Sequence, residues 1–283
     1  MRVLVTGSHG LIGSELVARL TALGHEVIRW NRKPLVSAEL ENIDAVVNLA
    51  GATTGKMPWT KNYKRELIES RVSTTQMLVT AINGCTNPPK VLVSGSASGF
   101  YGDTGSTSKL ESDPKGTGFL SDLANEWEQA ALKAKTRVVL VRTTMVLSRK
   151  LGALGKLMPI LKLGIGGPMG SGKQWWDWIS LPDEVGAIIH LMLDAKAEGV
   201  YNLTAPESST CTEVVKSLGK HLGRPTVFKL PAFAARLVLG EAADELLLCN
   251  QKLSSKKLEE SGYRFQHPTL ESAITWVTKN PAE

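Results

Sequence analysis

Short apolar runs and helical periodicity alternate through the first half of the chain. Apolar runs bounded by turn residues predict strands, at residues 2–6, 26–30, 44–49, 91–93 and 137–141. Apolar positions spaced three and four residues apart predict helices, at residues 11–23, 61–82 and 123–134. Strands that alternate with helices in this way form a parallel sheet with helices on both faces. We therefore expect an α/β fold, a doubly wound parallel sheet.

The pattern changes in the second half of the chain. Residues 152–172 are rich in glycine and predict loops around one helix. Beyond them we expect a helix at 182–193, a strand at 199–203 that returns to the sheet, and mostly helices from residue 210 onward. The chain thus divides into a larger region, residues 1–145, and a smaller, mostly helical region, residues 146–283, packed against it.

The turn between the first strand and the first helix has the glycine spacing of a dinucleotide-binding loop. Gly7 permits a tight turn, Gly10 lets the backbone approach a pyrophosphate, and Gly13 lets the helix sit close to the sheet. The helix N-terminus offers free N–H groups and a partial positive charge to the phosphates. We predict a Rossmann-type cofactor site, with a purely structural turn as the alternative. The expected contacts are Gly7, Ser8, His9, Gly10, Leu11, Ile12 and Gly13.

The end of the second strand indicates which dinucleotide binds. NAD-binding chains usually carry Asp or Glu there, and that carboxylate holds the ribose 2′-hydroxyl. This chain has no carboxylate at that point; it has Asn31, Arg32 and Lys33. The two cations would attract a 2′-phosphate, and Asn31 could add a donor. We therefore predict NADP rather than NAD, with an exposed basic turn as the alternative.

The third predicted strand ends in Leu49, Ala50 and Gly51. Small residues at such a point let the adenine ribose and the pyrophosphate of a dinucleotide lie against the backbone. The segment alone could serve packing, but after a glycine-rich first turn it indicates a wall of the cofactor site.

Composition and charge narrow the class of partner. The formal net charge is +6, but the basic residues are spread along the chain, so we expect no nucleic-acid partner. No apolar run reaches about 18 residues, so we expect no membrane partner. The first strand begins too early for a targeting peptide. Cys85, Cys211 and Cys249 lack metal-ligand spacing and indicate reduced thiols, so we expect no metal and a cytoplasmic location. Monomer and homodimer both remain open.

The strand, the glycine turn and the residues that follow resemble the short-chain dehydrogenase/reductase superfamily in its extended, epimerase-like form. Later motifs are similar to one atypical branch, whose members are labelled epimerase family proteins or nucleoside-diphosphate-sugar epimerase-like proteins. Their substrate is generally not known. The resemblance covers nearly the whole chain. The motifs that carry it are Arg65–Arg71, Tyr101–Asp103, Leu163–Pro168, Gly170–Gly172, Trp178–Ile179, Leu239–Glu241 and Asn250–Lys252.

The resemblance also exposes a missing feature of the catalytic site. Ordinary superfamily members carry a Tyr and a Lys four residues apart on the helix before the fifth strand, for proton transfer and for the nicotinamide ribose. No Tyr of this chain has a Lys four residues later, and in our alignment Phe119 and Leu123 occupy the two positions. The atypical branch is similar in lacking the pair. The superfamily Ser that binds the same substrate oxygen matches Ser96.

Arg71 falls where the superfamily carries an Asn. Its helical face also contains Leu67, Thr75 and Leu78 and should turn toward the sheet. A buried guanidinium needs a partner, either a cofactor phosphate or a carboxylate. Glu66 could hold Arg71 or a ribose hydroxyl. The resemblance implies that Glu66 and Arg71 contact the cofactor, and a structural ion pair is the alternative.

Two residues are candidates for the chemistry that the missing pair would perform. Tyr101 follows the fourth strand, on the sheet edge where ligands bind, and its phenol could act as a general acid if a neighbouring cation lowered its pKa. The alternative for Tyr101 is aromatic packing with Phe100. Ser96 could orient a carbonyl, and its alternative is a turn satisfied by its own hydroxyl.

Lys173, Trp175 and Asp177 lie in a tryptophan-rich segment that we expect to border the substrate cleft. Indole faces suit a flat or sugar-like ligand, and the Lys173 ammonium suits an anionic one. The alternative is that the tryptophans belong to the core.

The sequence leaves two functions in competition. The first is an NADP(H)-dependent oxidoreductase or epimerase-like enzyme for a small polar substrate, such as a carbonyl compound or a sugar nucleotide. In that case residues 1–145 hold NADP and residues 146–283 hold the substrate. The second is a non-catalytic NADP(H)-binding sensor or interaction protein that kept the nucleotide site and lost the chemistry.

Overall fold

A six-stranded parallel sheet forms the centre of the molecule. The computed structural model describes residues 1–30, 34–149 and 152–279. The strand order is β2-β1-β3-β4-β5-β8, and every neighbouring pair is parallel. The strands are β1 (Arg2–Thr6), β2 (Glu26–Arg29), β3 (Ala45–Asn48), β4 (Val91–Ala97), β5 (Arg137–Thr143) and β8 (Gly199–Leu203). The predicted α/β fold, a Rossmann-type doubly wound sheet, is confirmed.

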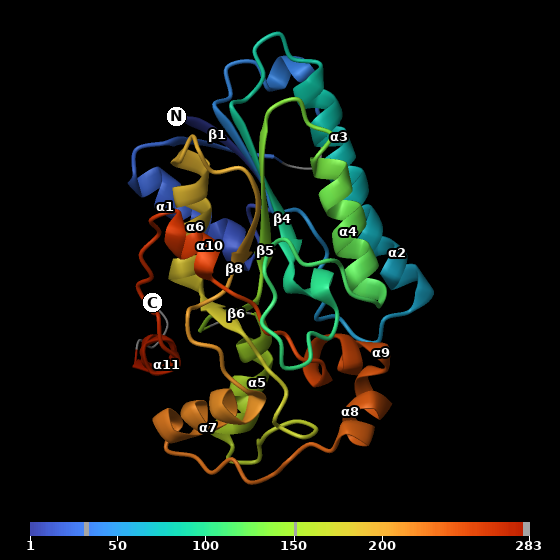
Figure 1. Cartoon of the computed structure of the whole chain (residues 1–283), viewed down its shortest axis with the longest axis vertical. Coiled ribbons are helices and arrows are strands. Elements are labelled where there is room, and N and C mark those ends of the chain that lie inside the picture. The colour runs from blue at the N-terminus through green and yellow to red at the C-terminus, as the bar shows by residue number, and fades with distance from the viewer. Residues whose placement is uncertain (31–33, 150–151, 280–283) are drawn as a thin grey trace.

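Helices cover both faces of the sheet because its strands present apolar side chains on both. Val3 and Val47 pack in one core with α1 and α6, whereas Leu4 and Val46 pack in another with α3 and α4. Figure 1 shows α1 and α6 on one side of the sheet and α3 and α4 on the other. The bounds of these helices are α1 (Leu11–Ala22), α3 (Val72–Asn83), α4 (Phe119–Ala131) and α6 (Leu181–Leu193).

The prediction of one unbroken helix is wrong. The segment predicted as a single helix at 61–82 forms two helices, α2 (Lys61–Glu69) and α3, with a break between them. The Ser70 hydroxyl donates to the Leu67 carbonyl at 3.2 Å and accepts from the Ala52 backbone N–H at 2.9 Å. A serine that bonds local backbone groups competes with helical hydrogen bonds, which accounts for the break. Arg71 is the N-cap residue of α3.

The smaller region is mostly helical and shares a second core with the strand pair β6–β7. Trp178, Leu154 and Val214 are among the buried residues of this core. The C-terminal helices lie mainly at the lower end of the molecule in Figure 1. The remaining elements are β6 (Met145–Leu147), β7 (Trp178–Ser180), α5 (Gly152–Lys162), α7 (Cys211–Leu222), α8 (Ala232–Leu239), α9 (Glu241–Ala243), α10 (Lys256–Glu260) and α11 (Leu270–Lys279), with short turns η1 (Ser37–Glu39), η2 (Ser98–Tyr101) and η3 (Asp244–Leu248).

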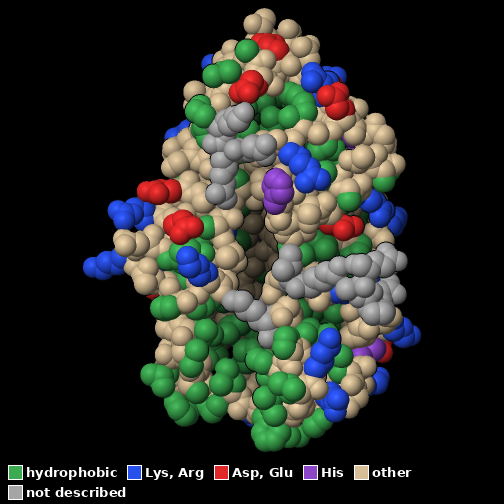
Figure 2. Space-filling model, turned by 180° about the vertical axis from the view of Figure 1, so that it is seen from behind, with side chains coloured by type: hydrophobic (Ala, Val, Ile, Leu, Met, Phe, Trp, Pro, Cys, Tyr) green, Lys and Arg blue, Asp and Glu red, His purple; other side chains and the backbone are tan. Residues whose placement is uncertain are grey.

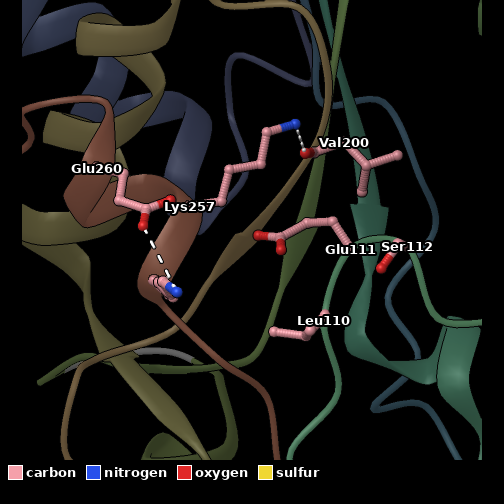
Figure 3. A pocket seen from close by; sticks show the side chains of 7 residues that line it. Leu110, Glu111, Ser112, Val200, Lys257 and Glu260 are labelled. Carbon is pink, nitrogen blue, oxygen red and sulfur yellow. Dashed lines mark hydrogen bonds and ion pairs between the residues drawn. The ribbon is translucent and has the colours of Figure 1, made fainter.

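Charged side chains cover the open side of the edge strand β8. The Lys257 Nζ donates to the Val200 carbonyl at 2.7 Å, and a Glu111 carboxylate oxygen accepts from the Asn202 N–H at 2.9 Å. Such side chains prevent another strand from pairing there. Lys257, Glu111 and Val200 line a cavity of about 470 Å³ (Figure 3). It borders the outer edge of the sheet, so it is distinct from the carboxyl edge, where the glycine turn lies.

Three observations bear on partners and location. Within residues 1–30, 34–149 and 152–279, no helix is long and apolar enough to cross a bilayer. The same residues contain no group of three or more His, Cys, Asp or Glu side chains that could hold a metal ion. Cys85, Cys211 and Cys249 are free thiols.

Candidate functional site

The glycine turn between β1 and α1 has two positions, Gly7 and Gly13, that are packed too closely for a side chain. Gly7 has φ +64°, and a Cβ there would lie 2.3 Å from the Leu49 carbonyl oxygen. A Cβ at Gly13 would lie 2.2 Å from the Gly7 carbonyl oxygen. The Gly10 N–H donates to the same Gly7 carbonyl at 3.0 Å and closes the turn. Both clashes are with backbone, so glycine is required at Gly7 and Gly13.

The N-terminus of α1 is left without a cap. Gly10 is the N-cap residue, no side chain of the described residues caps the helix, and the first turn contains no acidic residue. The orphan N–H groups and the helix dipole therefore remain available to an anion at the carboxyl edge of the sheet. The Ser8 side chain is buried while His9 is exposed, and Leu11 and Ile12 pack against the core beneath them.

The end of β3 is held against β1 by buried polar groups. The Thr6 hydroxyl accepts from the backbone N–H groups of Leu49 and Ala50, both at 3.1 Å, and donates to the Asn48 side chain at 2.7 Å. Asn48 in turn donates to Thr75 at 2.8 Å. The predicted cofactor wall is thereby fixed beside the glycine turn. Asn48 directly precedes the predicted wall, but the side-chain hydrogen bonds of Thr6 and Asn48 were not predicted, although each is a polar residue at the end of an apolar strand.

Arg71 reaches this wall with a buried positive charge. Its guanidinium donates to the carbonyls of Leu67 at 3.2 Å and Ala52 at 3.0 Å, and lies 5.4 Å from the Trp127 ring centroid. A Cβ at Gly51 would lie 2.9 Å from the guanidinium carbon, so the charge borders the segment expected to line the cofactor. Burial lowers the Arg71 pKa to about 10.

The structural ion pair considered for Arg71 does not form with any described carboxylate. Glu66 is exposed on α2, and no hydrogen bond joins it to Arg71. Three other residues predicted to contact the cofactor, Asn31, Arg32 and Lys33, lie outside the described residues.

Ser96 is held within the protein by a buried ion pair. Its hydroxyl donates to a Glu128 carboxylate oxygen at 2.6 Å. Arg142 makes a bidentate pair with the same carboxylate, both contacts at 2.8 Å, and all three side chains are almost fully buried. The Ser96 hydroxyl therefore faces α4 and the β4–β5 pair, and its partner is a carboxylate, not an open cleft.

The environment of Tyr101 differs from the one expected of a general acid. Its hydroxyl accepts from Arg142 at 2.7 Å and lies 2.8 Å from the Asn202 side-chain oxygen and 3.0 Å from the Leu110 carbonyl. The expected neighbouring cation is present, as Arg142. However, burial outweighs it and raises the pKa of Tyr101 to about 12. The Tyr101 ring also packs edge to face on Phe100, the alternative considered for it.

The start of α4 carries no titratable side chain at the positions of the superfamily pair. Phe119 packs edge to face against Trp59, and Leu123 is buried. The Glu245 carboxylate caps this helix, accepting from the N–H groups of Phe119 at 2.8 Å and Leu120 at 2.9 Å. No sequence pattern predicts this cap, because Glu245 lies more than a hundred residues later along the chain.

Lys173, Trp175 and Asp177 have three different environments. Lys173 is exposed, and the Lys252 ammonium lies 3.7 Å above the partly buried Trp175 ring. Asp177 is buried and accepts from the Leu253 N–H at 2.7 Å. Its other oxygen has no partner among the described residues, and burial raises its pKa to about 6. Asp177 therefore joins the β6–β7 pair to the C-terminal segment, while Lys173 and Trp175 face outward.

A second buried carboxyl group lies at the carboxyl end of β5. Glu184, on α6, accepts from the Thr143 hydroxyl at 2.7 Å. Burial raises the Glu184 pKa to about 8, so this side chain is largely neutral at pH 7. The sequence analysis did not identify Glu184, because a carboxylate in the first turn of a helix is common at exposed positions.

A cavity of about 390 Å³ lies between the larger and the smaller regions. Gly99 and Gly118 line it from the nucleotide side, and Arg236, Glu245 and Gln251 line it from the C-terminal side. Gly118 directly precedes Phe119, so the cavity adjoins the position where the superfamily places its catalytic Tyr.

This combination of a parallel sheet, a glycine-only turn and an uncapped helix defines a dinucleotide-binding protein of the Rossmann class. The model of the NAD dependent epimerase/dehydratase family matches residues 3–204, a range that contains the sheet except for Arg2, the first residue of β1. The chain therefore belongs to the NAD-dependent epimerase/dehydratase family. A second model, a domain of unknown function (DUF1731), matches residues 230–277.

Relatives cover the chain from end to end. The epimerase family protein ML0860 of Mycobacterium leprae is 37% identical over 299 residues, which cover 99% of this chain and 97% of that protein. The human epimerase family protein SDR39U1 is 38% identical over 291 residues, covering 97% of this chain and 98% of that protein.

Two solved structures are similar to this chain, one in both sequence and structure and the other in structure. The crystal structure of human SDR39U1 (isoform 2) with NADPH superposes with a TM-score of 0.93 and 35% identity, covering 99% of this chain and 100% of that one. A UDP-glucuronic acid 4-epimerase from Bacillus cereus, solved with UDP-glucuronic acid and NAD, has a TM-score of 0.79 but 18% identity, covering 99% and 98% of the two chains. The second comparison shows a shared fold.

Proposed function

We propose that this protein binds NADP(H) and is an oxidoreductase or epimerase-like enzyme for a small polar substrate. The uncapped N-terminus of α1 behind Gly7 and Gly13 supports the proposal most strongly, because it offers free N–H groups at the carboxyl edge of the sheet. The human relative that shares 35% identity was solved with NADPH, which supports NADP(H) over NAD. Asn31, Arg32 and Lys33 are proposed to receive the 2′-phosphate.

Arg71 supports an anionic ligand at the same edge. Its guanidinium is bonded to two carbonyl groups and to no described carboxylate, so its charge is not neutralised within the described residues. A cofactor phosphate beside Gly51 would supply the missing negative charge. Leu49, Ala50 and Gly51 would form the wall that the phosphates and the ribose contact, and exposed Glu66 is placed to accept from a ribose hydroxyl.

Bound NADPH would supply a hydride to a carbon atom of the substrate, and bound NADP⁺ would accept one from it. The protein's own residues position the reactants. Ser96 and Tyr101 are proposed to hold the carboxyl ends of β4 and β5 through Glu128 and Arg142. Because both hydroxyls are already engaged and Phe119 cannot transfer a proton, water is the proposed proton source.

The proposed division of labour follows the two regions. Residues 1–145, together with β8, would hold the cofactor, and residues 146–283 would hold the substrate, with Lys173, Trp175 and Asp177 along its side of the cleft. We place the protein in the cytoplasm because its cysteines are free thiols. It would act as a monomer or a homodimer.

A non-catalytic NADP(H)-binding protein is the second candidate. The start of α4 favours it, because Phe119 and Leu123 replace both titratable residues of the superfamily pair. Screening carbonyl compounds and nucleotide sugars for a change in NADPH absorbance separates the two candidates. Turnover of any of them supports the enzyme, and tight cofactor binding with no turnover supports the sensor.

Cofactor binding is tested by titrating NADPH and NADH into the wild-type protein and a Gly7→Ala variant. We expect tighter binding of NADPH, and at least about tenfold weaker binding by the variant, because the new Cβ displaces the Leu49 carbonyl. Gly105→Ala is the matched control, since Gly105 has a similar φ of +59° with open space around it. Equal affinities for NADH and NADPH, or an unaffected Gly7→Ala variant, would contradict the proposal.

A further inference from the structure

Helix α8 buries a small side chain and exposes three large apolar ones. Ala235 is 1% exposed, whereas Phe233 is 73% exposed, Leu237 85% and Val238 70%. A helix on the surface of a water-soluble domain normally turns its large apolar face to the core. The reversed arrangement leaves an apolar face of α8 with nothing packed on it among the described residues.

Neighbouring segments extend this face into a larger apolar surface. The Leu230 N–H donates to the Pro168 carbonyl at 3.0 Å, and the Gly170 N–H donates to the Leu230 carbonyl at 2.8 Å, so the two segments lie side by side before α8 begins. Figure 2 shows hydrophobic side chains gathered over this lower end of the molecule. We call the set the α8 surface: Leu163, Ile165, Val227, Phe228, Phe233, Leu237 and Val238, all more than half exposed.

The surroundings of the α8 surface carry positive charge. Residues 129–176 contain no Asp or Glu, and neither do residues 214–240. Lys162, Arg224 and Lys229 are exposed within these two stretches. Both stretches contribute to the α8 surface. Two acidic residues follow at the end of α8, but Asp244 pairs with Arg236 at 2.9 Å and Glu241 pairs with Lys64. Lys162, Arg224 and Lys229 have no ion pair among the described residues, so they give the surroundings of the apolar side chains their positive charge.

From this pairing of apolar and cationic side chains we infer that the α8 surface docks on a lipid bilayer that contains anionic lipid. Exposed apolar patches of this size mark interaction sites. Phe, Leu and Val enter the boundary between headgroups and acyl chains, while Lys and Arg bind anionic headgroups. The attachment is peripheral and needs no spanning helix, and none is found in the described part of the chain. It departs from the expectation of no membrane partner, which rested on the lack of a spanning apolar run alone.

Charge and shape favour a bilayer over another protein. A symmetric contact between two copies of the α8 surface would bring two sets of cations, each with Lys162, Arg224 and Lys229, into one interface, and like charges oppose such contact. None of the seven apolar side chains lines either of the two cavities described above, so these cavities offer no pocket for an anchor residue of a protein partner. A fluid bilayer accepts projecting side chains without a matching pocket.

The test is co-sedimentation of the full-length protein with vesicles of phosphatidylcholine alone or mixed with phosphatidylglycerol. We expect binding to the mixed vesicles that weakens as salt is raised, because salt screens the cations. A Phe233→Ser/Leu237→Ser variant should bind at least about tenfold more weakly, since each lost apolar side chain removes several buried carbon atoms. A Lys162→Glu/Lys229→Glu variant should lose the preference for phosphatidylglycerol.

Two controls make the result decisive. Leu23→Ser/Leu132→Ser removes two exposed leucines of the nucleotide half, 54% and 48% exposed, and should bind vesicles like the wild type. Thermal unfolding of every variant verifies that it is folded, a check that does not depend on NADP(H) binding. The inference is overturned if the wild type does not sediment with mixed vesicles. It is also overturned if the Phe233/Leu237 variant binds them unchanged, or if sedimentation velocity shows that these residues form a dimer contact instead.

Discussion

Arg71 is a cation held by carbonyl groups in place of a carboxylate. Its two acceptors are the carbonyls of Leu67 and Ala52, and burial lowers its pKa to about 10. Partial dipoles offset a buried charge less well than an anion does, so Arg71 contributes little to the stability of the free protein. A phosphate placed beside Gly51 would be attracted by the full positive charge of the Arg71 guanidinium. At the scale of the residue, we therefore expect Arg71 to contribute to cofactor binding much more than to folding.

Replacing Arg71 with Met should affect binding far more than folding. The two carbonyls lose a hydrogen bond each while the buried charge disappears, so the free energy of unfolding should change by less than about 1 kcal/mol. Hydrogen bonds to charged groups are worth about 1.5–3 kcal/mol, so the dissociation constant for NADPH should rise about ten- to a hundredfold. Chemical denaturation and fluorescence titration measure the two quantities.

Arg65→Met is the matched control for this substitution. Arg65 is exposed on α2 and donates to the Asn62 side chain, so its replacement should leave both stability and NADPH affinity near wild type. An Arg71→Met variant that loses stability but binds NADPH normally would contradict the role proposed for Arg71.

At the scale of elements, the predictions from sequence were correct where neighbouring residues determine the helices and strands. They were wrong where contacts with distant residues determine where a helix begins or breaks. The strands of the sheet were found because buried parallel strands are continuous apolar runs. The helix at 61–82 was predicted as unbroken because apolar spacing continues through Ser70, whose hydroxyl bonds to Leu67 and Ala52. The helix predicted from residue 123 begins at Phe119 instead, and the cap that fixes this start is Glu245.

The Glu245 cap predicts a measurable link between the smaller region and α4. Its carboxylate satisfies two N–H groups that α4 leaves free, those of Phe119 and Leu120. Because loss of an N-cap costs about 0.5–2 kcal/mol, Glu245→Ala should lower the free energy of unfolding by that amount. Urea denaturation followed by circular dichroism measures it.

Glu241→Ala provides the comparison for this cap. Glu241 lies nearby in α9 and pairs with Lys64 at the surface, where an ion pair contributes about 0–1 kcal/mol. The Glu241 variant should therefore be the more stable of the two. Equal free energies of unfolding for the two variants would show that the Glu245 contacts with α4 do not stabilise the protein.

At the scale of the molecule, the least predictable feature is the buried polar network that spans the sheet. Ser96 on β4, Glu128 on α4, Arg142 on β5 and Asn202 on β8 are brought together only by the strand order. The glycine turn could be predicted because spacing along the chain encodes it. The network could not, since its members are separated by as many as 106 residues and look like ordinary polar positions.

Tyr101→Phe tests whether this network serves structure or chemistry. The hydroxyl contacts Arg142, Asn202 and Leu110, so its loss leaves buried groups short of a partner and should lower the free energy of unfolding by about 1–3 kcal/mol. NADPH affinity should stay within about twofold of wild type, because burial raises the Tyr101 pKa to about 12 and the hydroxyl is enclosed by protein.

Tyr63→Phe is a matched control, since its hydroxyl bonds one partner, the Thr53 carbonyl. Unchanged stability together with a large loss of NADPH affinity would place the Tyr101 hydroxyl at the cofactor, because a hydroxyl confined to the network can affect binding only through the fold.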